Sequence, residues 1–207
     1  MKKHILMVYF LFITASVFVM CTNPGKENGQ DGTPEQTASP TGEEKPENRI
    51  AEQDTIKGSI PSEASGSIGP ANIKINYYAP GVKGRILWGG LVPYDQVWVT
   101  GAHMATNMET DRDIIIGEQK IQTGKYALFT IPGREEWTVI INNNWEQHLA
   151  DDYDQKEDIL RLTVKPLVQD RHRERLKYEV KPVSETEGTI NISWDKLMIA
   201  IPVKVTS

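Results

Sequence analysis

The chain has 207 residues, a formal net charge of −5 and 39% hydrophobic residues, a lower apolar share than a fully folded chain of this length usually has. Acidic residues slightly outnumber basic ones and no basic stripe is present, so nucleic acid is excluded as an expected partner. A single cysteine excludes a disulfide within the chain.

The N-terminus has the pattern of an export signal. Lys2 and Lys3 precede an apolar run over residues 5–20, which at about sixteen residues is short for a membrane span and typical of a signal peptide. Cys21 follows directly, so we expect residues 1–20 to be a lipoprotein signal peptide and Cys21 to be acylated, with palmitate among its chains. Met20 departs from the usual lipobox, which has Gly, Ala or Ser there. An ordinary secretory signal or an uncleaved anchor is the alternative.

The next segment, residues 21–57, is predicted to be a disordered polar linker. Between residues 22 and 57 the apolar residues are Ala38, Ile50, Ala51 and Ile56, too few to offset a backbone ordering cost of about 1–2 kcal/mol per residue. An acylated cysteine and a flexible tether would hold the protein at a membrane of the cell envelope, with the outer membrane favoured. The domain would then lie in the periplasm or at the cell surface.

Residues 58–207 are expected to form one domain, long enough for a single core. Apolar and polar residues alternate with a period of two in several places, which predicts half-buried strands. The clearest alternations centre on Ile73 to Tyr77, Leu160 to Val164, Leu176 to Val180, and Ile190 to Trp194. Three other runs are apolar on both faces, as expected of central strands, at residues 126–131, 137–141 and 197–203.

These patterns predict an all-β fold, a single β-sandwich of about ten short strands, jelly-roll-like or closed into a flattened barrel. Residues 169–177 are interpreted as a charged loop leading into a strand, with a helical turn as the alternative. The basic run 171–175 could meet anionic lipid headgroups, but a solvated surface balanced by Asp170 and Glu174 is favoured.

Several consecutive motifs resemble a known family. They are Tyr-Ala-Pro-Gly-Val-Lys-Gly-Arg at residues 78–85, Gly-Gly-Leu-Val-Pro-Tyr at 89–94, and Gly-Lys-Tyr-Ala-Leu-Phe-Thr-Ile-Pro-Gly at 124–133. Together they resemble the bacterial domain of unknown function 2911. The resemblance implies an exported protein and no assigned activity. The family usually has Arg, Asn and Glu where this chain has Val99, His103 and Met104, so any site made by those polar residues is altered here.

Two segments are candidate ligand-binding sites. In the first, Trp98, His103 and Thr106 could line a pocket, with Gly101 allowing close backbone approach. Aromatic faces beside a few fixed polar groups suit a sugar or small ligand. The alternative is that Trp98 belongs to the core and His103 ends a strand.

The second candidate is the polar loop after the apolar run 137–141. It contains the candidate residues Asn142, Asn144, Trp145, His148 and Tyr153. Amide groups beside an exposed tryptophan would form a platform for a carbohydrate. The carboxylates of residues 151–154 could instead collect oxygen ligands for calcium, although their spacing matches no calcium loop and a solvated acidic turn is favoured.

Catalysis has little support in the sequence. No Gly-x-Ser-x-Gly motif occurs, the four histidines have no metal-ligand spacing, and Cys21 is assigned to the lipid. We therefore expect no catalytic residue, metal or cofactor, and a membrane-anchored envelope lipoprotein that binds a glycan or small polar ligand without catalysis. A structural lipoprotein that docks an envelope protein is the alternative, and an enzyme is the least favoured.

Overall fold

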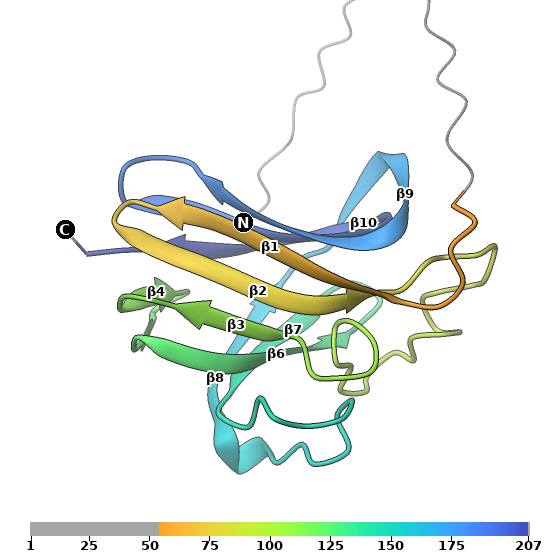
Figure 1. Ribbon diagram of the computed structural model, residues 1–207, viewed down its shortest axis with the longest axis horizontal. Coiled ribbons are helices and arrows are strands. Elements are labelled where there is room, and N and C mark those ends of the chain that lie inside the picture. The colour runs from red at the N-terminus through yellow and green to blue at the C-terminus, as the bar shows by residue number, and fades with distance from the viewer. Residues whose placement is uncertain (1–53, 207) are drawn as a thin grey trace, which may run out of the picture. The chain divides into compact units, whose positions relative to one another are not determined.

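The computed structural model describes residues 54–206, and within them the period-two patterns do form strands (Figure 1). The expected signal peptide, Cys21 and residues 21–53 of the expected linker lie outside the described residues. The strands are β1 (Ile60–Ile68), β2 (Ala71–Ala79), β3 (Asn107–Thr110), β4 (Ile114–Ile116), β5 (Gln119–Ile121), β6 (Gly124–Pro132), β7 (Trp137–Asn142), β8 (Asp158–Val164), β9 (Leu167–Pro182) and β10 (Glu187–Lys204).

The strands form two antiparallel sheets that do not close into a barrel, so the fold is a β-sandwich. One sheet has six strands in the order β1-β2-β3-β6-β7-β8, and the other has four in the order β5-β4-β10-β9. Helical structure in the described part is confined to a 3-10 turn, Gln155–Glu157. Within residues 54–206, no helix is long and apolar enough to cross a membrane.

The main core lies between the inner faces of the two sheets. In β2, Ile73, Ile75 and Tyr77 point inward and are buried, while the polar residues between them are more exposed. They share one hydrophobic cluster with Tyr178 of β9 and Trp194 of β10. The fold therefore depends on the alternation visible in the sequence, because one face of each strand is removed from water.

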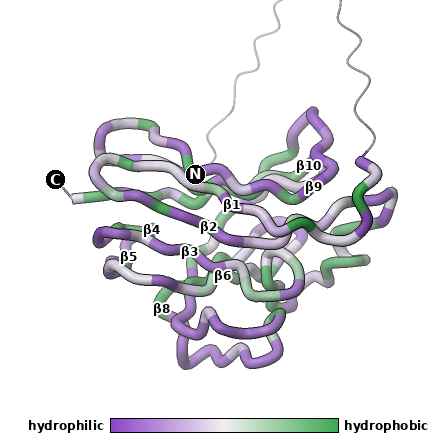
Figure 2. The backbone as a smooth tube through the Cα atoms, in the orientation of Figure 1, coloured by the Kyte–Doolittle hydropathy of each residue, from purple (hydrophilic) through white to green (hydrophobic). Residues whose placement is uncertain are grey.

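A second, smaller core covers the opposite face of β6 and β7. Ala127 and Phe129 of β6 and Ile140 of β7 are fully buried there, beneath apolar side chains from residues 97–105 and 145–153. This second covering explains why β6 and β7 are apolar on both faces. The residues of the loop after β7 are nevertheless mostly hydrophilic (Figure 2).

The interpretation of residues 169–177 as a loop was wrong, because they lie inside the sixteen-residue strand β9. Charged residues are accommodated because β9 is the edge strand of the four-stranded sheet, where side chains can reach water. The partner strand β10 is irregular at this point. Its register shifts on both sides of Asp195, which has a positive φ of 51°. In the strand pairing, Asp195 lies opposite Arg173 of β9.

Candidate functional site

The structure brings the two candidate segments together on the outer face of β6 and β7. Met104 and His148 form an isolated β-bridge, the Ala105 N–H donates to the Gln147 carbonyl at 2.9 Å, and the Leu149 N–H donates to the His103 carbonyl at 2.6 Å. The segments are therefore one layer of structure, in which some candidate residues support the layer and others face an open space.

Asn142 and Asn144 hold the second segment in place. Asn142 is fully buried, and its amide donates to the Asp158 carboxylate at 2.8 Å and to the Asp154 carbonyl at 3.0 Å. Its side-chain oxygen accepts the Asn144 N–H at 2.8 Å. These bonds occupy both the nitrogen and the oxygen of the side-chain amide. The Asn142 side chain therefore supports the loop and is not available to a ligand.

Trp145 is more covered than a platform residue would be. The sequence predicted substantial exposure, but the side chain is partly buried against the second core, and the Lys125 ammonium lies 3.7 Å from the centre of its ring. The apolar neighbours and the attraction of a cation to the aromatic face explain the difference. A sugar could stack on this face only by displacing Lys125.

Tyr153 and His148 complete the second segment. The Tyr153 ring meets Phe129 edge-on at 5.5 Å, and its hydroxyl donates to Asp158 at 2.7 Å and accepts from Arg161 at 2.9 Å. Burial, with the neighbouring Asp158 carboxylate, raises the pKa of Tyr153 to about 12. His148 is exposed and contacts Asp151 at 2.9 Å. These contacts stabilise the loop.

The first segment does border a cavity. Trp98 and Gly101 line a cavity of about 620 Å³, a volume in the range of small-molecule sites. The other two candidates of this segment lie elsewhere: Thr106 is buried and donates to the Thr100 carbonyl at 3.1 Å, and His103 is exposed with its ring edge-on to Tyr78 at 5.0 Å.

Aromatic and aliphatic side chains make up most of the cavity wall. Trp98 and Trp194 stack at 5.8 Å with nearly parallel rings, and Trp88 and Trp137 pack behind them in the core. The indole N–H of Trp98 donates to the Gly101 carbonyl at 3.2 Å, which holds the ring in position. The other apolar wall residues are Pro80, Leu91, Val92, Val99, Ala102 and Leu149.

Two cations, which the sequence did not single out as site residues, also line the cavity. Arg85 donates from Nε to the Val82 carbonyl at 3.1 Å and from Nη2 to the Gly81 carbonyl at 2.6 Å. Lys83 contacts Asp54, at 2.5 Å from the carbonyl and 3.4 Å from the carboxylate. Their alternation with Val82 and Gly84 gave no signal that both would face one space, because that depends on the turns of this loop.

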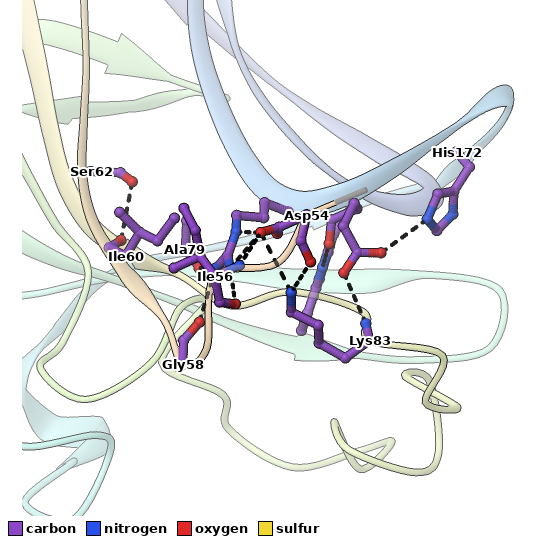
Figure 3. Close-up of polar contacts among 12 residues, drawn as sticks. Asp54, Ile56, Gly58, Ile60, Ser62, Ala79, Lys83 and His172 are labelled. Atoms are coloured by element: carbon purple, nitrogen blue, oxygen red, sulfur yellow. Dashed lines mark hydrogen bonds and ion pairs between the residues drawn. The ribbon is translucent and has the colours of Figure 1, made fainter. Parts of the chain in front are cut away.

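Residues 54–58, at the start of the described chain, lie against the domain beside this cavity (Figure 3). Arg175 of β9 contacts the Asp54 carboxylate at 2.5 Å and donates to the carbonyls of Ile56 at 2.8 Å and Gly58 at 2.9 Å. The pKa of Asp54 is lowered, mainly because its carboxylate accepts a hydrogen bond from the Arg175 guanidinium. Thus residues 54–57, which the sequence assigned to the linker, contact the sandwich, and Gly58 with Ser59 forms one wall of the cavity.

The basic run of β9 is balanced by acidic neighbours. His172 contacts Asp195 at 2.8 Å and Glu174 at 3.4 Å, and Glu174 also accepts the Lys83 N–H at 2.9 Å. Residues 54–206 contain no group of three or more histidine, cysteine or acidic side chains arranged to hold a metal ion.

Close packing at Gly101 leaves little space for a side chain. A Cβ at this position would lie 2.7 Å from the Thr106 hydroxyl and 3.3 Å from the Tyr78 carbonyl. We expect Gly101→Ala to lower the free energy of unfolding by about 1–3 kcal/mol, as overpacking does. Urea unfolding of the two proteins measures this difference. An unchanged midpoint would show that the loop shifts freely and that Gly101 has no packing role.

The three positions that depart from the family pattern lie in two different environments. Val99 is buried and lines the cavity, whereas His103 and Met104 are exposed on the loop.

The comparisons with known proteins identify a family and no activity. The family model described as "Protein of unknown function (DUF2911)" matches residues 59–203, which covers β1 to β9 completely and all of β10 except Lys204. No curated protein matches the chain. No solved structure matches it either. The family resemblance of the sequence motifs is therefore confirmed, and the chain belongs to the DUF2911 family of proteins of unknown function.

Proposed function

We propose that this protein is a lipid-anchored protein of the cell envelope whose β-sandwich binds a small ligand without catalysis. The ligand occupies the cavity between residues 58–59, 80–85, 91–92, 98–102 and 149, with Trp194 at its base. The observation that carries the proposal is this cavity of about 620 Å³, walled by Trp98 and Trp194 on a rigid core.

The chemistry of the wall favours a ligand with an apolar body over a bare glycan. Apolar side chains predominate, and both tryptophan N–H groups of the lining already have acceptors: Trp98 donates to the Gly101 carbonyl and Trp194 to the Glu174 carbonyl, each at 3.2 Å. The amide-rich loop expected to bind a glycan is occupied by its own hydrogen bonds, and Lys125 covers Trp145.

An envelope-protein partner is the alternative function, and one feature favours it. Leu167 and Val168, at the start of edge strand β9, have exposed fractions of 51% and 81%. An edge strand with exposed apolar side chains is a template for pairing with another chain. Neither residue lines the cavity, so the two functions can be tested separately.

Binding of a neutral apolar dye, N-phenylnaphthylamine, tests the cavity directly. The chain from residue 22 to residue 207 keeps every described residue and avoids the acylated cysteine. We expect the dye to bind it saturably with enhanced fluorescence. Ala102→Trp should weaken binding by about tenfold or more, because a large side chain then fills the cavity that Ala102 lines.

Met104→Trp is the matched control, because Met104 lies on the same loop, is exposed and does not line the cavity. It should bind the dye as the unchanged chain does. Absence of saturable binding in the unchanged chain would overturn the cavity proposal and leave the protein-docking function as the better one. Equal loss in both variants would place the dye elsewhere on the loop.

A further inference from the structure

We infer that the cavity selects an anionic amphiphile, a molecule with an apolar body and a single carboxylate, phosphate or sulfonate head, and that Arg85 binds the head. The inference rests on the proposed binding function and adds the chemical class of the ligand. Three observations carry it: the fixed position of the Arg85 guanidinium, the local balance of charges and the apolar rim of the cavity.

Arg85 is held by the backbone and has donors to spare. Its bonds to the carbonyls of Gly81 and Val82 use Nε–H and one N–H of Nη2. A guanidinium has five N–H donors, so three remain, on Nη1 and Nη2, in the planar arrangement that matches the two oxygens of a carboxylate or phosphate. Because the carbonyls fix the side chain, little conformational freedom is lost when an anion binds.

The charges around the cavity leave this guanidinium without an acidic partner. Lys83 and Arg175 are both paired with Asp54, and Glu174 accepts the Lys83 N–H. Among residues 54–206, no carboxylate forms an ion pair with Arg85, and none lines the cavity. Asp54 is thus already shared by two cations, and Arg85 is the cation of the lining that has no carboxylate partner among the described residues.

The rest of the cavity suits the apolar part of such a ligand. Leu91 and Leu149 line it while remaining 44% and 37% exposed, so they form an apolar rim that leads inward to Trp98 and Trp194. Burial of each methylene of a ligand contributes about 0.8 kcal/mol, and the indole rings provide broad apolar faces. A cationic amphiphile would be repelled by the unpaired charge of Arg85, and a neutral amphiphile would leave that charge without an anion.

Two dyes that differ by one group test the inference on the unchanged chain of residues 22–207. Anilinonaphthalene sulfonate has the same aromatic body as N-phenylnaphthylamine with a sulfonate added. We expect the anionic dye to bind about tenfold more tightly, or better, since hydrogen bonds to a charged group are among the strongest. Dodecanoate should displace the neutral dye at a lower concentration than dodecanol, and dodecyltrimethylammonium should displace it least.

Arg85→Gln locates the selectivity. It should bring the affinity for the anionic dye close to that for the neutral dye while leaving the neutral dye's affinity within about twofold, which also shows that the cavity is intact. Arg112→Gln is the matched control. It also removes an arginine charge, but Arg112 precedes β4 and lies near the β1–β2 turn, outside the cavity lining, so the affinity for each of the two dyes should stay unchanged. Dodecyl phosphate and dodecanoate compared side by side distinguish a phosphate ligand from a carboxylate one.

The outcomes separate the two proposals. If neither dye binds, the binding function itself fails. If both dyes bind equally well to the unchanged chain, or if dodecanol displaces as well as dodecanoate, the cavity binds apolar molecules but the anionic selectivity is wrong. If the anionic preference persists in Arg85→Gln, another cation provides it and the assignment to Arg85 is overturned.

Discussion

Trp137→Ala should lower the free energy of unfolding by about 3–5 kcal/mol, the cost of truncating a buried tryptophan. Trp137 begins β7, is 3% exposed, and packs against Trp88 at 4.8 Å and Trp98 at 6.4 Å. Its loss would leave a cavity beneath the residues that form the binding-site wall. Because a domain of this size has a total stability of the order of 5–15 kcal/mol, the variant should be near the limit of folding.

Trp145→Ala is the matched comparison, since it removes the same side chain from the second core. Trp145 is partly buried and stacked with Lys125, so we expect a smaller loss of about 1–2 kcal/mol. Urea denaturation followed by far-ultraviolet circular dichroism measures both. If Trp145→Ala destabilises the domain as much as Trp137→Ala, the second core contributes as much to stability at this position as the main core, and the expectation of a minor role for Trp145 is wrong.

Cys21→Ser should abolish lipid attachment, which the proposed anchoring needs. Acyl chains contribute about 0.8 kcal/mol per buried methylene to membrane binding, and serine offers no thioether attachment site. The variant should incorporate no labelled palmitate. It should either leave the membrane fraction or retain its signal peptide, which mass spectrometry of the N-terminus distinguishes.

Thr22→Ala is the control for this change, because it alters the neighbouring residue and keeps the cysteine. It should be acylated and membrane-bound like the unchanged protein. Normal maturation of Cys21→Ser, together with full retention in membranes, would show that the lipoprotein assignment is wrong and that residues 1–20 act as another kind of export signal.

Much of the fold was determined by the sequence, because strand burial depends on a local period. Ile73, Ile75 and Tyr77 alternate with polar neighbours, and that pattern requires a sheet with one face against a core. The runs 126–131 and 137–141 correctly predicted central strands covered on both faces. The charged residues 171–175 concealed a strand, because an edge strand can be polar and local sequence does not show which strands will lie at an edge.

The sequence singled out the loop that contains Trp98 and Gly101, and both residues line the cavity, but the sequence could not say which other side chains would share that space. That was decided by tertiary structure. The turns of residues 80–92 bring Arg85 to the same cavity as Leu149, more than sixty residues away in the sequence, and Trp194 of β10, the last strand, also lines it. Packing also made Asn142 a buried support and covered Trp145. A residue type indicates which chemistry is available, whereas long-range contacts decide whether that chemistry faces a core, a neighbour or a cavity.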